Sequence, residues 1–158
     1  MQSFSIREYR DEDAGRLARL FYETVHVVNA ADYTAEELEV WAPADADPEA
    51  WAAGFGGTLA LVAQQGELLV GFANMAPGGL LDRLYVHHDY LRQGIASALC
   101  AALEASVPAP RYTTHASATA LPFFLSQGYH LRRPNIVPLG DQLLRNFLLE
   151  KRAQIFPH

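Results

Sequence analysis

The stretch Leu84-Tyr85-Val86-His87-His88-Asp89-Tyr90-Leu91-Arg92-Gln93-Gly94-Ile95-Ala96-Ser97-Ala98-Leu99 decides the fold of this chain. Its first residues are typical of a strand, and a short loop leads from them into a helix that begins at Gly94. The first amides of a helix have no partner inside the helix and lie at the positive end of its dipole. Gly94 and Ala96 carry little or no side chain, so a diphosphate could approach this backbone closely. The residues alone leave two interpretations open, an anion site or a tight strand-to-helix connection.

Two better-known phosphate motifs are excluded at this position. No Gly-Lys-Ser/Thr follows, so the loop is not a P-loop. No G-x-G-x-x-G is present either, so the segment is not a dinucleotide-binding fingerprint.

The elements on either side follow from hydrophobic periodicity and turn residues. Upstream, the pattern predicts a strand at 4–9, helices after Asp11 and after the capping box Thr34-Ala35-Glu36-Glu37, a further helical turn at 48–51, and three strands at 58–63, 68–75 and 80–86. Downstream, it predicts a helix at 94–106, a strand at 112–115, a helix at 117–127, and strands at 129–131 and 143–150. A strand meander followed by one β-α-β crossover predicts a mixed sheet with helices on both faces.

Composition limits the class of protein. The chain has 158 residues, of which 50% are apolar and 19% charged, and this predicts a single domain with a real core. The net charge of −6 and the lack of a basic stripe argue against a nucleic-acid partner. No 18-residue apolar stretch is present, so we expect no membrane span. A single cysteine cannot form an internal disulfide or a thiolate zinc site. The first residues show no signal-peptide pattern, and we expect a cytoplasmic location.

The loop resembles the pyrophosphate loop of the GNAT superfamily of N-acetyltransferases, Q/R-x-x-G-x-G/A after a strand with the pattern L-x-V-x-P. Here the loop is Leu91-Arg92-Gln93-Gly94-Ile95-Ala96 after Leu84-Tyr85-Val86, with Leu91 and His88 at the positions where Gln or Arg and Pro are usual. A second family pattern, N-x-x-A-x-x-x-Y-x-x-x-G-F, is matched by Ser117, Ala120, Phe124, Gly128 and Tyr129. Residues 33–42, 116–124 and 146–147 resemble the YafP-like branch of the family.

This resemblance implies an α/β (α+β) fold: a mixed, mostly antiparallel, twisted sheet with a V-shaped cofactor cleft between two parallel strands. It implies one acetyltransferase domain over residues 1–158, with 151–158 as a short C-terminal tail. The implied reaction transfers an acetyl group from acetyl-CoA to a primary amine of a small molecule or a peptide, without a metal, and a homodimer is possible. The implied cofactor-binding residues are Leu84, Tyr85, Val86, Leu91, Arg92, Gln93, Gly94, Ile95, Ala96, Ser97, Ser117, Ala120, Phe123 and Phe124.

Proton transfer needs side chains, and the first candidate is Asp82. The two-residue period of a strand predicts Asp82 on the face of Leu84 and Val86, with Tyr85 on the other face. An acidic group there could take the amine's proton through water, although a strand-end surface carboxylate is the other interpretation. Tyr22 and Tyr33 are further catalytic candidates. The resemblance implies an acceptor pocket in the first third of the chain, and the candidates for the acceptor site are Tyr22, His26, Tyr33, Trp41 and His115.

Two departures define a rival hypothesis. Family members often use a tyrosine as acid at the position of Phe124, which has no proton to give and is typical of a core aromatic. With Leu91, this substitution favours an acyl-CoA-binding regulatory module without turnover. His87-His88-Asp89 resembles metal ligands, but adjacent residues at a strand end point apart, so we expect no metal site.

Overall fold

The predicted three-strand meander forms the middle of one sheet in the computed structural model, which describes residues 3–153. The meander consists of β2 (Leu59–Gln65), β3 (Leu68–Met75) and β4 (Leu80–Val86). The seven-stranded sheet has the order β1-β2-β3-β4-β5-β7-β6, and its other strands are β1 (Ser5–Glu8), β5 (Arg111–Ser117), β6 (His130–Leu139) and β7 (Gln142–Arg152). Among the strands of the described residues only β4 and β5 run parallel, which confirms the predicted fold class.

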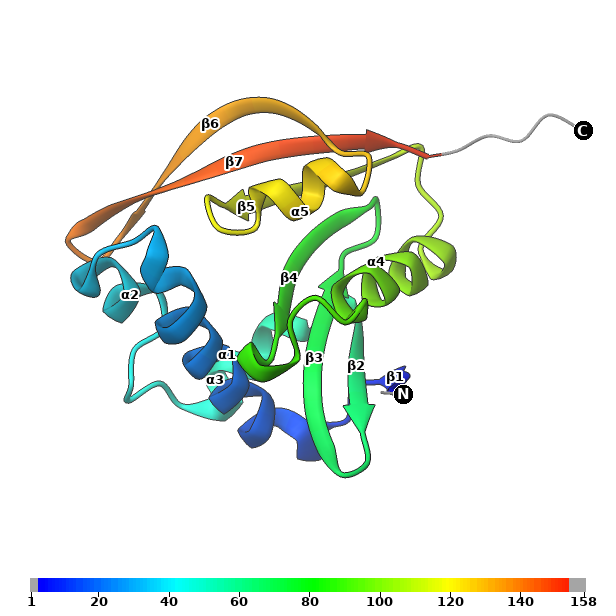
Figure 1. The fold of residues 1–158 in the computed structure, drawn as a ribbon, viewed down its shortest axis with the longest axis horizontal. Coiled ribbons are helices and arrows are strands. Elements are labelled where there is room, and N and C mark those ends of the chain that lie inside the picture. The colour runs from blue at the N-terminus through cyan, green and yellow to red at the C-terminus, as the bar shows by residue number, and fades with distance from the viewer. Residues whose placement is uncertain (1–2, 154–158) are drawn as a thin grey trace, which may run out of the picture.

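Helices cover both faces of this sheet (Figure 1). On one face, α4 (Ile95–Ser106) and α5 (Leu121–Ser126) pack with β3 and β5 in the largest hydrophobic cluster. On the other face, α1 (Ala14–Val28), α2 (Ala35–Trp41) and α3 (Pro48–Ala52) cover two further clusters. Short 3₁₀ segments lie at 11–13, 29–31, 53–55 and 88–90. No helix within residues 3–153 is both long and apolar enough to cross a bilayer.

The parallel pair separates almost at once. Only Leu80 with Thr113 and Leu81 with Thr114 are paired between β4 and β5. The Thr114 hydroxyl donates a buried hydrogen bond of 3.0 Å to the Leu81 carbonyl and holds the strands together at this end. Beyond it β4 turns away from β5, as Figure 1 shows, and the V-shaped opening predicted from the resemblance lies between them.

A β-bulge interrupts β4 and overturns one prediction. Asn74 of β3 pairs with Arg83 and Met75 with Leu81, so Asp82 is an extra residue in β4. The Asn74 amide donates to Asp82 at 3.4 Å, and Asn74 lies on the same face of β3 as the buried Phe72. Asp82 therefore lies on the α1 side of the sheet, and the prediction that it shares a face with Leu84 and Val86 was wrong. The two-residue period fails here because a bulge shifts the alternation of side chains.

The largest differences from the predicted boundaries concern α5, β6 and the C-terminal tail. Helix α5 begins at Leu121 instead of Ser117, which ends β5. Strand β6 continues to Leu139, well past the predicted 129–131, because its long pairing with β7 outweighs the weak strand pattern of a segment with two prolines. The tail was predicted to begin at 151, but Lys151 pairs with Tyr112 and β7 ends at Arg152; residues 154–158 lie outside the described part of the chain.

A buried carboxylate fixes the start of α1, the helix that faces the opening. Both oxygens of Asp13 accept hydrogen bonds of 2.9 Å from the Arg7 guanidinium, and one also accepts the Arg10 backbone N–H at 2.8 Å. The Asp13 side chain is 1% exposed and that of Arg7 is 21% exposed. The hydrogen bonds from Arg7, opposed by burial, hold the pKa of Asp13 below its ordinary value of 3.8.

We predict that Asp13→Asn lowers the free energy of unfolding by about 3 kcal/mol at pH 7, because it removes the buried negative charge that pairs with the partly buried Arg7 guanidinium. The pKa of Asp13 is lower in the folded protein than in the unfolded chain. The stability that the Asp13 carboxylate contributes is therefore complete above pH 3.8, and it is lost as the pH falls through the folded-state pKa. Denaturant unfolding from pH 7 to 2 measures it, with the exposed Asp11→Asn as control. A pH-independent difference between Asp13→Asn and the native chain would contradict the assignment.

Candidate active site

The opening between β4 and β5 contains a cavity of about 420 Å³ with a mostly apolar lining. Its walls come from α1, the end of β4, the loop 90–94, the first turn of α4, and the segment after β5. The lining residues are Thr24, Val28, Asn29, Leu84, Tyr85, Val86, Tyr90, Leu91, Arg92, Gly94, Ile95, Ala96, Ser97, Ser117, Thr119, Ala120 and Phe123. The volume falls within the range typical of small-molecule and cofactor sites.

The backbone of the loop at the mouth of this cavity has the conformation of an anion site. Arg92 (φ 62°) and Gly94 (φ 84°) both adopt left-handed conformations, and Arg92 is the one described non-glycine residue that does so. Left-handed residues in such a turn direct neighbouring N–H groups into one concavity. Gly94 is the N-cap of α4 and offers no side chain, so the first free amides of the helix stay open to a ligand. A Cβ built on Gly94 meets no atom within 4 Å, so open space lies beside it.

Most predicted cofactor-binding residues line this cavity. The two that do not are Gln93, which is exposed, and Phe124, which is 3% exposed in the core and lies against a second cavity. Sequence reasoning missed the wall formed by α1. There the Thr24 hydroxyl donates a buried hydrogen bond of 3.2 Å to the Val86 carbonyl, which uses one of the acceptor positions expected for a ligand. Thr24 and Val28 share a helix face, but this spacing is equally typical of residues packed on a sheet.

A second cavity, of about 200 Å³, lies on the other side of the same opening. Aromatic and polar residues of α2, β4 and β5 form one wall, and the β6–β7 hairpin forms the other. Four residues line both cavities: Leu84, Tyr85, Ser117 and Ala120. The two cavities therefore meet where β4 and β5 diverge.

Asp82 lies in this second cavity with a single hydrogen-bond partner. Asn74, which is fully buried, uses its side-chain amide to donate to Thr58 Oγ1 at 3.2 Å and to Asp82 at 3.4 Å. Neighbouring Arg83 lies on the same side of the sheet but reaches toward α3, and its guanidinium lies 4.8 Å from the centre of the Trp51 ring. Within the described residues Asp82 forms no ion pair. It is thus an oriented carboxylate with free oxygen positions.

Two hydroxyl groups lie at the junction of the cavities. Burial raises the pKa of Tyr85 to about 12, and a hydrogen bond from Trp41 opposes this rise. Ser117 Oγ accepts hydrogen bonds from Asn29 Nδ2 at 3.4 Å and from the Ala120 N–H at 3.1 Å. Both hydroxyl groups therefore stay protonated at neutral pH. No acceptor for either hydroxyl hydrogen is identified within residues 3–153.

Tyr33 lines the second cavity, but its hydroxyl proton is already donated within the protein. It donates to the Arg145 carbonyl at 2.6 Å and accepts the Ala118 N–H at 2.9 Å. Burial raises the pKa of Tyr33 as well. We therefore reassign Tyr33 from a proton carrier to a residue that joins α2, β7 and the β5–α5 segment.

The remaining acceptor candidates divide into two groups. Trp41 and His115 line the second cavity as predicted. Tyr22 and His26 line neither cavity: their ring centres lie 4.2 Å apart with the planes tilted by 32°, and His26 Nε2 lies 2.8 Å from the Ala42 carbonyl at the end of α2. The structure does not bring them to either cavity, because their shared face of α1 turns toward the loop after α2, and their roles in catalysis and acceptor binding stay predictions.

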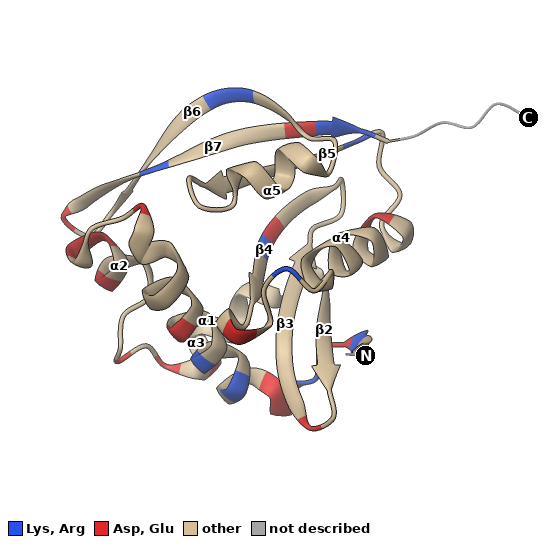
Figure 2. Ribbon diagram, in the orientation of Figure 1, with Lys and Arg blue, Asp and Glu red and all other residues tan. Residues whose placement is uncertain are grey.

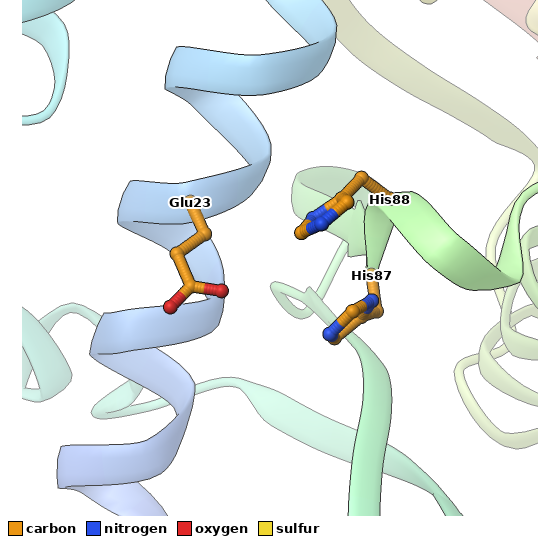
Figure 3. Close-up of side chains that lie close together, drawn as sticks. All are labelled: Glu23, His87 and His88. Carbon is orange, nitrogen blue, oxygen red and sulfur yellow. The ribbon is translucent and has the colours of Figure 1, made fainter.

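His87, His88 and Glu23 lie close together on the surface (Figure 3). One ligand atom from each lies within 4.8 Å of the others, and the two rings stack at 4.6 Å. The reason given above for expecting no metal, that these histidines point apart, was therefore wrong. His87 Nδ1 accepts the Asp89 N–H at 3.1 Å, so this nitrogen is already occupied. None of the three residues lines the two cavities, and the absence of a metal from the reaction stays a prediction.

The comparisons with known proteins agree with this geometry. The family described as acetyltransferase (GNAT) domain matches residues 29–140, more than half of the chain. The Escherichia coli K12 protein named uncharacterized N-acetyltransferase YafP is 28% identical over 98% of this chain and 99% of its own length. A crystal structure of a GCN5-related N-acetyltransferase from Rhodopseudomonas palustris is 33% identical, with a TM-score of 0.91 over 97% of this chain and 98% of that chain.

A more distant structure extends the comparison of the fold. The PaiA N-acetyltransferase of Thermoplasma acidophilum, solved in complex with coenzyme A, has a TM-score of 0.77 at 20% identity and covers 96% of this chain and 99% of its own. At that identity the likeness concerns the fold alone.

We predict that Gly94→Val weakens the binding of acetyl-CoA at least tenfold, because a β-branched side chain is strained at φ 84° and fills the open space beside the free amides. Isothermal titration calorimetry measures the dissociation constant. Gly66→Val is the matched control, since Gly66 also has a positive φ (62°) and open surroundings but lies in the β2–β3 turn. If both variants bind acetyl-CoA with equal affinity, the loop at Gly94 is only a connection between β4 and α4 and does not bind the co-substrate.

We predict that Tyr33→Phe lowers the free energy of unfolding by about 2 kcal/mol, from the loss of two hydrogen bonds, and leaves the shape of the pH–rate profile unchanged. The control is Tyr22→Phe, whose hydroxyl forms no identified hydrogen bond within residues 3–153 and lies outside both cavities. The reassignment of Tyr33 fails if one limb of the pH profile disappears while the stability stays the same.

Proposed function

Because the chain belongs to the GNAT family of acetyltransferases, we propose that it transfers an acetyl group from acetyl-CoA to the primary amine of a small acceptor. In the balanced reaction, the amine nitrogen bonds to the acetyl carbonyl carbon, the bond from that carbon to sulfur breaks, and the products are the N-acetyl amine and coenzyme A. The neutral amine loses one proton in this reaction, and one proton ends on the sulfur; a protonated amine first gives up its additional proton to solvent. A cytoplasmic location and a homodimer stay predictions from the sequence and its resemblance.

One observation carries this proposal: the two cavities meet at Leu84, Tyr85 and Ser117. The larger cavity ends at the open amides of the α4 N-terminus and suits a long co-substrate with a diphosphate. The smaller cavity contains a carboxylate and aromatic walls and suits an amine. A reaction between two substrates needs their reacting atoms held together at one point, and two cavities that meet can each hold one substrate there.

The residues present fit acetyl-CoA. Amides of residues 92–97 would hold the pyrophosphate, and the edge of β4 from Leu84 to Val86 would hold the pantetheine arm. Solved proteins of similar fold support this fit, since the Thermoplasma PaiA structure contains coenzyme A. When bound, acetyl-CoA supplies a thioester carbonyl that a neutral amine can attack.

Asp82 and the hydroxyls at the junction would handle the protons. An alkyl amine has a pKa of about 10.4 and is mostly protonated at pH 7, so a base must remove a proton before the nitrogen can attack. The Asp82 carboxylate is the base that we assign, acting directly or through one water. Ser117 and Tyr85 each have a hydrogen to donate, and either can stabilise the departing sulfur in place of the tyrosine that Phe124 replaces.

The test is release of coenzyme A from acetyl-CoA with a panel of primary amines, together with acetyl-CoA affinity measured directly. We expect turnover with some amines and none without an acceptor. Tight binding of acetyl-CoA with no turnover on any amine would instead support the rival hypothesis, an acyl-CoA-binding regulatory module.

We predict that Asp82→Asn lowers kcat by about 100-fold or more, the usual contribution of a general base, and leaves the affinity for acetyl-CoA unchanged. Steady-state kinetics from pH 6 to 10 measure it, and the loss shrinks at high pH, where free amine is abundant. Asp45→Asn is the control, since Asp45 is exposed in the loop before α3 and lines neither cavity. A variant with native kcat would remove Asp82 from the mechanism.

A further inference from the structure

Three side chains that can bind a metal ion come together beside the co-substrate cleft, from two elements that are distant in the sequence. Glu23 belongs to α1, and His87 and His88 follow directly after β4. Figure 3 shows both rings extending toward the helix that carries Glu23, and one ligand atom of each residue lies within 4.8 Å of the other two. Two imidazoles and one carboxylate form a donor set with which proteins bind Zn²⁺ and related divalent ions.

His88 has ring nitrogens that are available to a ligand. Its Nδ1 is buried and has no hydrogen-bond partner among residues 3–153. Its Nε2 has only a contact of 3.7 Å with the exposed Asp89 carboxylate. Buried polar atoms are normally satisfied, and one that is left without a partner in the protein often marks the place of an ion.

His87 can coordinate an ion through Nε2. Its Nδ1 accepts the Asp89 backbone N–H at 3.1 Å. A neutral imidazole that binds a metal through Nε2 carries its hydrogen on Nδ1, so this hydrogen bond is given up when the ion binds. The bond lies at the surface, where the Asp89 N–H can turn to water, and its loss therefore costs little.

Glu23 has one oxygen free and room to move. Its Oε1 accepts a hydrogen bond of 2.9 Å from Arg19, and Oε2 has no identified partner among residues 3–153. A tetrahedral ion with bonds of about 2.0–2.1 Å holds its ligand atoms roughly 3.4 Å apart, so the three ligands must close in by up to about 1.4 Å. The rotatable Glu23 side chain, which is 35% exposed, allows this approach.

The charges around the two histidines favour a cation. Figure 2 shows acidic residues on α1 and on the 3₁₀ segment after β4, and these residues are Glu23 and Asp89. The positive partner of Glu23 is Arg19, which is 82% exposed, and an ion pair in water contributes little. A metal ion can therefore replace Arg19 as the partner of this carboxylate.

We propose that Glu23, His87 and His88 bind one divalent transition-metal ion of the Zn²⁺ class, with water at the remaining position. The ion joins α1 to the end of β4, next to the hydrogen bond from Thr24 to the Val86 carbonyl. The three ligands line neither cavity, so the ion holds the wall of the cleft from outside and does not touch the substrates. The inference does not rest on the proposed function.

Binding of Zn²⁺ alone to the full chain, carrying no histidine tag, is the first test. We expect isothermal titration calorimetry to give one Zn²⁺ per chain. We expect no binding of Mg²⁺ at the same concentrations, because Mg²⁺ prefers six oxygen ligands. A chain that binds no Zn²⁺, or that binds Mg²⁺ equally well, overturns the proposal.

Variants of the ligands locate the ion. Glu23→Gln and His88→Gln are each expected to weaken Zn²⁺ binding by about tenfold or more, since even residues outside the ligand set have effects of this size. Glu36→Gln and His130→Gln are the matched controls, because both residues are exposed, lie outside the cluster and form no identified side-chain contact within the described chain. Native affinity in His88→Gln overturns the proposal. Thermal unfolding without metal verifies the fold of each variant.

The link between α1 and β4 has a readout of its own. A ligand that binds only the folded chain raises the unfolding temperature, so Zn²⁺ is expected to stabilise the native chain and to leave Glu23→Gln almost unchanged. An equal shift in both proteins places the ion elsewhere and overturns the proposal. These measurements use no acetyl-CoA and no amine, so the metal site and the proposed function stand or fall separately.

Discussion

The candidate site depends on how few residues pair β4 with β5. At one end, the strands are joined by two residue pairs and by the hydrogen bond from the Thr114 hydroxyl to the Leu81 carbonyl. Past that point the facing edges of β4 and β5 are no longer paired with each other. Backbone polar groups near a core need partners, so an edge that lacks a strand must find them elsewhere. The Thr24 hydroxyl satisfies one, the Val86 carbonyl. The other groups along this edge are left for a ligand, and the cleft is thus a direct consequence of unfinished strand pairing.

The bulge at Asp82 decides what lies on the acceptor side of that cleft. With regular alternation, Asp82 would face α4 and the apolar core, where a carboxylate is costly to bury. The extra residue turns it toward Asn74 and the aromatic residues around α1. Arg83 then fits between the Trp51 and Phe55 rings, and its guanidinium occupies the space where a Cβ on Gly54 would lie. A single inserted residue therefore gives this face both its free carboxylate and its packing.

The two halves of the site differ in how far a sequence can predict them. The co-substrate half is local: strand, loop and helix follow one another from Leu84 to Ser97, and its main contacts come from backbone amides that need only Gly94 and small neighbours. Such a segment can be recognised in one stretch of sequence, and in the loop Tyr90, Leu91, Arg92 and Gly94 line the cleft. The acceptor half gathers side chains from α2, β4, β5 and β7. Tyr22 and His26 were expected there but lie outside both cavities, because helical spacing predicts a shared face but not the direction of that face.

Long-range pairing also explains why the hairpin escaped prediction and why it matters. Strand β6 lengthens only through its partner β7, and the acceptor wall that includes Val137, Leu144 and Arg145 exists only when this hairpin extends beyond β5. The Tyr33 hydroxyl then joins the Arg145 carbonyl to the Ala118 amide, so α2, the hairpin and the end of β5 form one rigid wall. None of these hairpin residues lines the larger cavity. Because the two cavities share only the residues at their junction, we expect changes in the hairpin to alter the choice of acceptor and to leave the co-substrate cleft intact.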